Sequence, residues 1–176
     1  MLLTQQNGTR VWSMGINGAL DFWRITDNTV GAARLVISNT GNIGLGSGVT
    51  NPTSPIQHSN GATLSAGGVW TNASSRALKT NIRSLNARDA FSALRQMTPV
   101  TFEYKADPAE HHVGFIAEDV PELVATTDRK GLSAMDVVAV LTKVVQEQQQ
   151  VIADLKVKVD RLEITQTKKV RRTKKQ

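Results

Sequence analysis

A heptad repeat near the carboxyl end constrains the fold more than any other feature of the chain. Its a and d positions alternate by three and four residues across 138–162, and all but one are apolar. They are Val138, Leu141, Val145, Gln148, Ile152, Leu155, Val159 and Leu162. A plain amphipathic helix would drift off this register, so the repeat predicts a coiled coil, with about 37 Å of helix over these residues.

The ends and partners of this helix follow from neighbouring residues. Ser133, followed three residues later by Asp136, resembles a capping box, so we expect the coiled-coil helix to occupy 133–165. β-branched residues at a with Leu at d slightly favour a dimer. Gln148 occupies a d position, where a polar residue specifies the register or the oligomeric state of a coiled coil.

The amino-terminal half differs, because Gly, Asn, Ser and Thr separate short apolar pieces there. Asn-Gly pairs at 7–8 and 17–18, and Thr40-Gly41, predict turns between strands over residues 1–50. Strands with so little apolar mass cannot bury a core alone, so association with identical chains would supply the missing surface. A flexible, partly disordered segment is the alternative. Residues 51–73, rich in Pro, Gly and hydroxyls, predict a linker or the thin end of a stalk.

Residues 74–132 predict a small α+β unit. Asn86 can cap a helix that presents Ala90, Phe91, Leu94 and Met97 on one face and stops at Pro99. Residues 100–105 alternate as a strand does, residues 111–116 predict a second strand, and a short helical turn should follow over 117–124. The fold class expected for the whole chain is therefore α+β.

Charge and composition exclude several functions. The net charge is +6, but the last nine residues hold six bases and no acid, so the rest of the chain is balanced. We expect 166–176 to be a disordered basic tail. Nucleic-acid binding through it is disfavoured, because basic zippers place their basic helix before the heptads. The chain lacks cysteine, its three histidines lack metal-ligand spacing, and no apolar run is long enough for a membrane, so no metal, cofactor or membrane partner is expected.

Four motifs occur in an order that resembles a known family. They are "SSRALKTNI", "VTFEYK", "HVGFIAEDVPELV" and "MDVVAVLTKVVQEQQQVIADL", within residues 74–165. The chain is similar here to the carboxyl-terminal intramolecular chaperone of phage endosialidases, tail spikes and tail fibres, a self-cleaving peptidase. Upstream, "ARLVISNTGNIGLGSG" is similar to the repeat of tail-fibre stalks.

The resemblance implies a homotrimer, with a trimeric β-stalk and a trimeric coiled coil, against the slight preference of the heptads for a dimer. It further implies that the domain assembles three chains and then cleaves itself off between Ala73 and Ser74, with Ser74 as nucleophile and Lys79 as base. The expected location is a virion tail fibre or spike, or the host cytoplasm during assembly, with a phage, prophage or bacterial source. The family's usual Ser-Asp pair is Ser-Ser here, and Glu118 stands where Gln is common.

A Ser-Lys pair is a recognised variant of the catalytic triad. Free lysine, with a pKa of about 10.4, is a poor base, and burial that removes water from the amine makes it a better one. Five residues are off-phase for a helix, so the pair must converge through a turn. The alternatives are an uncut trimerisation module with the same fold, or a capped turn with a surface lysine. His112 is expected to be structural, and Glu118 and Asp119 to be solvated.

Overall fold

The computed structural model describes residues 2–17 and 21–173 and falls into two units, Met1–Ile82 and Arg83–Gln176. The first unit is built from strands and the second contains two α-helices and a hairpin, so the predicted α+β class is confirmed. The boundary between the units lies after Ile82, whereas the boundary predicted from the sequence follows Ala73. The turn expected at Asn17-Gly18 lies partly outside the described residues.

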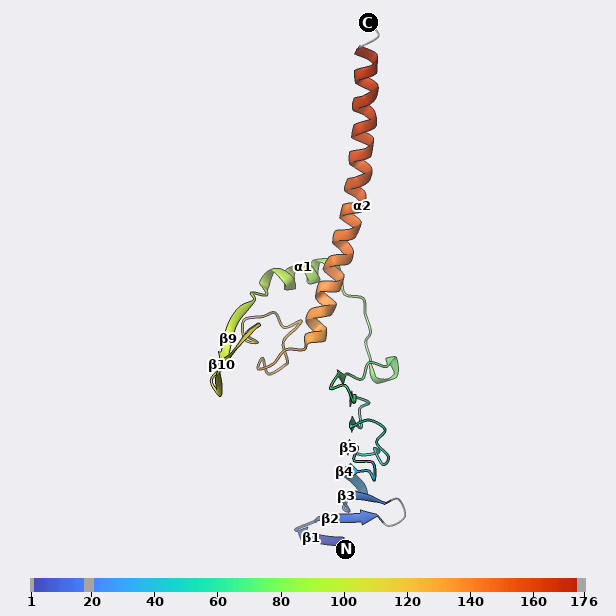
Figure 1. Ribbon diagram of the computed structural model, residues 1–176, viewed down its shortest axis with the longest axis vertical. Coiled ribbons are helices and arrows are strands. Elements are labelled where there is room, and N and C mark those ends of the chain that lie inside the picture. Colours follow the sequence, from blue (N-terminus) through green and yellow to red (C-terminus); the bar gives the residue numbers. More distant parts are fainter. Residues whose placement is uncertain (1, 18–20, 174–176) are drawn as a thin grey trace. The chain divides into compact units, whose positions relative to one another are not determined.

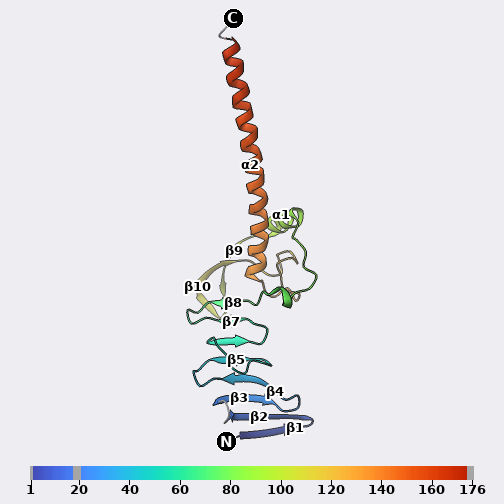
Figure 2. The same cartoon turned by 90° about the vertical axis from the view of Figure 1, so that its right-hand side faces the viewer.

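The first unit is an eight-stranded sheet whose strands follow one another in chain order (Figure 2). All neighbouring pairs are antiparallel except the parallel pair β5–β6. The turns expected at Asn7-Gly8 and Thr40-Gly41 are present, each with its glycine at positive φ. The strands are β1 Leu2–Asn7, β2 Arg10–Asn17, β3 Phe22–Asp27, β4 Ala32–Ile37, β5 Ile43–Leu45, β6 Ile56–His58, β7 Thr63–Leu64 and β8 Trp70–Thr71.

Residues 51–73 continue this sheet through β6, β7 and β8, so of the two predicted alternatives, a linker or the end of the β unit, the structure has the second. Their polar residues close tight turns. Asn60 Oδ1 accepts the Ala62 N–H at 2.9 Å, and Ser65 Oγ accepts the Val69 N–H at 3.1 Å. Gly61 adopts φ 91°, where other residues are strained. The composition that suggested a linker therefore serves turns between very short strands.

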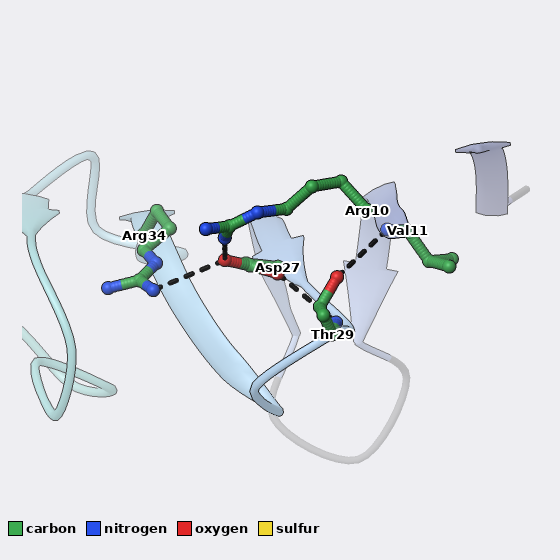
Figure 3. A network of polar contacts seen from close by, with 5 residues as sticks. All are labelled: Arg10, Val11, Asp27, Thr29 and Arg34. Carbon is green, nitrogen blue, oxygen red and sulfur yellow. Dashed lines mark hydrogen bonds and ion pairs between the residues drawn. The ribbon is translucent and has the colours of Figure 1, made fainter. Parts of the chain in front are cut away.

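A buried carboxylate ties three strands of the sheet together (Figure 3). Asp27 is 1% exposed, and its Oδ2 accepts hydrogen bonds from Arg10 at 2.9 Å and Arg34 at 3.2 Å. Its Oδ1 accepts the Thr29 N–H at 3.1 Å, and Thr29 Oγ1 in turn accepts the Val11 N–H at 2.9 Å. A buried charge is tolerated only when paired and hydrogen-bonded, as this one is.

In the second unit α1 lies against the first turns of α2 (Figure 1). The core packs there, and the segment before α2 adds Val120 and Val124 to it. The sequence prediction for α1 is confirmed: Asn86 Oδ1 accepts the Asp89 N–H at 2.8 Å, and the helix ends before Pro99. The elements are α1 Ala87–Gln96, β9 Val100–Tyr104, β10 Asp107–Gly114 and α2 Ala134–Thr173. The core consists of Ala90, Ala93, Met97, Val120, Val124, Val140 and Val144, with Phe91 and Leu94 packed against it.

The segment between the hairpin and α2 differs from the prediction. β10 begins at Asp107 rather than residue 111, beyond a two-residue turn from β9. The helical turn expected over 117–124 is two separate turns, because Pro121 has no N–H to continue a helix. Arg129 closes the segment by donating from Nη2 to the carbonyl oxygens of Glu118 at 2.5 Å and Val120 at 2.6 Å.

Helix α2 begins as the sequence predicted, with Ser133 Oγ accepting the Asp136 N–H at 3.4 Å. It runs to Thr173, beyond the expected end at 165 and into the tail expected to be disordered. Residues 134–173 contain no Gly or Pro, so no residue in this range is expected to break the helix. Within the described residues, no helix is both long and apolar enough to cross a bilayer.

Candidate active site

Ser74 and Lys79 are in direct contact. The Nζ of Lys79 donates a hydrogen bond of 2.7 Å to the Oγ of Ser74. Both residues belong to the first unit and follow strand β8 closely. The structure therefore brings the two residues of the expected pair within hydrogen-bond distance, which is the first requirement for a base and its nucleophile.

A single 3₁₀ turn, η1 (Arg76–Leu78), produces this contact. Ser75 is its N-cap, and its Oγ accepts the Ala77 N–H at 3.3 Å. The turn closes when the Arg76 carbonyl accepts the Lys79 N–H at 3.1 Å. Lys79 then leaves in an extended conformation, with φ −124° and ψ 147°. The five-residue spacing, which no α-helix could bring together, is thus closed by a turn, as the sequence predicted.

Ala73, the residue before the expected scissile bond, follows the end of the sheet. Strand β8 pairs with β7 through Thr71 and Thr63, two residues before Ala73. Ala73 is half-buried, and a Cβ built on Gly61 would lie 3.4 Å from its Cβ. The backbone is thus held by the ladder before the bond and by η1 after it.

The pair is open to solvent in the isolated chain, because Ser74 and Lys79 are both exposed. The apolar residues near Lys79 in the sequence are also exposed, Leu78 at 60% and Ile82 at 51%. An apolar pocket around Lys79 therefore requires a further surface.

The other polar candidates lie in the second unit. His112 stacks on Phe102, with ring centroids 5.6 Å apart, and meets the edge of Tyr104 at 5.1 Å. These contacts are those of a packed structural residue. Glu118 and Asp119 are exposed. The described residues contain no group of three or more His, Asp or Glu side chains placed to hold a metal ion.

The heptad positions form an exposed stripe along α2. Their apolar members are between 41% and 65% exposed, and Gln148 is exposed as well. The same helix buries Val140 and Val144 against the core of its own unit. The a and d side chains therefore remain available to another chain.

The sheet of the first unit carries an apolar face that sequence reasoning missed. Residues opposite one another in neighbouring strands project from the same side of a sheet, and here they form two apolar columns. Leu3, Ile16 and Trp70 on this face are 54%, 61% and 61% exposed. One column is Leu3, Met14, Ile25, Leu35 and Leu45, and the other is Ile16, Trp23, Ile37, Ile43, Ile56, Leu64 and Trp70. The alternation Trp12-x-Met14-x-Ile16 was the available signal.

A comparison with known protein families finds a match for the part of the chain that contains Ser74 and Lys79. Residues 74–129 match a peptidase family described as chaperone of endosialidase. The match begins at Ser74 and includes Lys79, and it confirms the resemblance over these residues. No curated protein and no solved structure matches the chain.

Proposed function

We propose that this chain is the intramolecular chaperone end of a trimeric tail fibre or spike, which assembles three chains and then cleaves itself off between Ala73 and Ser74. The observation that carries the proposal is the 2.7 Å contact between Lys79 Nζ and Ser74 Oγ, located within a segment of a peptidase family. The family supports the chaperone role. Cleavage and three-chain assembly are our inferences.

In the structure Lys79 Nζ donates the hydrogen bond to Ser74 Oγ, whereas cleavage requires Lys79 to accept a proton from that hydroxyl. As a neutral amine, Lys79 accepts the Ser74 hydroxyl proton, and Oγ attacks the carbonyl carbon of Ala73. The peptide C–N bond breaks, the proton passes to the Ser74 nitrogen, and an ester joins Ala73 to the Ser74 oxygen. Water then hydrolyses this ester, leaving a carboxylate on Ala73 and the restored hydroxyl of Ser74.

Two exposed apolar surfaces support assembly as the step before cleavage. The heptad stripe of α2 and the two-column sheet face both leave large side chains in water in the isolated chain. Contiguous exposed apolar surface of this kind is typical of an interface. The resemblance supports three chains as the stoichiometry.

Exposure of Lys79 supports a coupling between the two steps. In a single chain Lys79 is exposed to water, and no packing against its amine prepares it to act as a base. When neighbouring chains cover Leu78 and Ile82, they would also strip water from the adjacent amine and favour its neutral form. Cleavage would then report completed assembly.

Intact mass of the purified assembly tests the proposal. Cleavage at the expected bond divides the 176-residue chain into pieces of 73 and 103 residues. A verified trimer that keeps its full 19.1 kDa chain through long incubation would exclude self-cleavage. The chain would then act as a trimerisation module without cleavage. This is the second candidate function, and the exposure of Lys79 to water supports it.

A further inference from the structure

We propose that Ser75 is a positioning residue for the cut, because its side chain caps the turn that brings Lys79 to Ser74. This inference rests on the proposed function. Ser75 has extended backbone angles, φ −60° and ψ 142°, as N-cap residues do. Its Oγ accepts the Ala77 N–H at 3.3 Å, and its carbonyl accepts the Leu78 N–H at 3.1 Å.

Little else holds this turn. None of the three residues of η1 is buried, so packing within the chain does not fix it. A 3₁₀ turn this short is marginal by itself. The cap therefore contributes much of the stability of the turn. The closed turn fixes the position of the Lys79 backbone, from which the side chain reaches Ser74.

The cap also fixes the carboxyl side of the scissile bond. On the amino side, the backbone is held by the Thr63–Thr71 pair of strands β7 and β8. Ser75 supplies the matching constraint one residue after Ser74. Holding both sides restricts the motion of the hydroxyl relative to the carbonyl that it attacks, and restriction of this kind accelerates intramolecular reactions.

The inference also explains why Ser75 can stand where the resemblance led us to expect aspartate. Serine, aspartate and asparagine are all strong N-cap residues, whereas alanine cannot cap. Losing a cap lowers the population of a marginal turn by about 2- to 30-fold. Ser75→Ala should slow cleavage by about that factor, and Ser75→Asp or Ser75→Asn should restore the rate.

The first experiment follows cleavage of the full-length chain by intact mass against time, with Ser84→Ala as the control for an exposed serine. We expect Ser75→Ala alone to be slow, with unchanged oligomeric state and melting temperature. Cleavage of Ser75→Ala at the wild-type rate would overturn the inference. Complete loss of cleavage that neither aspartate nor asparagine restores would also overturn it, because Ser75 would then act as a reactant.

A second experiment does not depend on cleavage. The chain has no cysteine, so Ser74→Cys with Lys79→Cys creates a unique thiol pair. We expect a short bifunctional thiol reagent to cross-link the two thiols efficiently in the chain that keeps Ser75 and in Ser75→Asp, and poorly in Ser75→Ala. Equal yields would overturn the positioning role. A wild-type chain that never cuts while the yields still differ would instead overturn the proposed function alone.

Discussion

Val144 and Val145 are adjacent in α2 and have opposite environments: Val144 is 2% exposed and Val145 is 50% exposed. Val144 packs into the core between α1 and α2, whereas Val145 is an a position of the heptad stripe. One helix therefore has two different faces: one packs into its own fold, and the other is the face that we propose contacts another chain. The pair allows folding and assembly to be separated by mutation.

Val145→Glu should abolish self-association and leave the fold intact. The substitution places a charge in the seam of the proposed coiled coil, whereas in the isolated chain the Val145 side chain is half exposed to water. Sedimentation should find single chains, and circular dichroism should find the wild-type helix content. Val145→Glu chains that still form the native assembly would contradict the proposed interface.

Val144→Ala is the matched substitution on the other face. It removes buried methyl groups from the core of the second unit and should cost about 1–3 kcal/mol of unfolding free energy. Chemical denaturation measures this cost, while sedimentation at low denaturant should still find the assembly. A loss of assembly without any loss of stability would show that our division of the two faces is wrong.

Ser74→Ala and Lys79→Arg should both stop cleavage and preserve assembly. The first removes the nucleophile. The second keeps the charge and the hydrogen-bond donors, but arginine does not deprotonate and cannot act as a base. We expect the Lys79→Arg rate to fall by at least about 100-fold, measured by intact mass. Lys105→Ala, an exposed lysine outside the pair, is the control and should cut normally.

Acid should weaken the first unit through Asp27. Burial raises the pKa of this carboxyl, but hydrogen bonds from Arg34 and Thr29 and the charge of Arg10 outweigh burial and hold the pKa below its ordinary 3.8. A folded pKa below the unfolded one stabilises the fold above about pH 4. This contribution disappears as the pH falls through the lower folded value.

Thermal melts of the uncut Ser74→Ala chain at pH 7 and pH 3 measure this effect. Asp27→Asn should melt lower at pH 7, because it leaves Arg10 and Arg34 without their carboxylate. It should also lose less on acidification than the chain that keeps Asp27. An equal acid response in the two chains would contradict the role of this network.

Gly44→Ala should destabilise the sheet by steric conflict. A Cβ at this position would lie 2.8 Å from Cγ1 and 3.0 Å from the carbonyl oxygen of Val49, which is 8% exposed. Overpacking of this kind costs about 1–3 kcal/mol, measured by denaturation of the Ser74→Ala chain. Gly67→Ala is the control, because its nearest atom would be Ser65 Oγ at 3.8 Å. Equal stability of the two variants would contradict the close approach.

The sequence predicted those features whose signals are local. The Asn86 cap, the strand Val100–Tyr104 and the helix that carries the heptads all follow from spacing within one element. The contact between Ser74 and Lys79 was predicted through the resemblance, and the off-phase spacing correctly required a turn.

Other features depend on pairings between distant residues. Strands β7 and β8 contain two residues each, too few to have a period, so the sequence left open whether the segment is a linker or the end of a stalk. The bonds of Asp27 to Arg10 and Arg34 require a strand register that composition does not contain. Arg129 donates to the carbonyl oxygens of Glu118 and Val120, and no sequence motif predicts such a contact.

Every strand pair of the sheet lies at or before Thr71. Scission after Ala73 would therefore break no ladder hydrogen bond, and the severed stalk would keep the contacts it had before. What it would lose is the segment that assembled it. A stalk opened later by heat or acid would lack the means to reform, so its durability would be governed by the rate of opening rather than by an equilibrium.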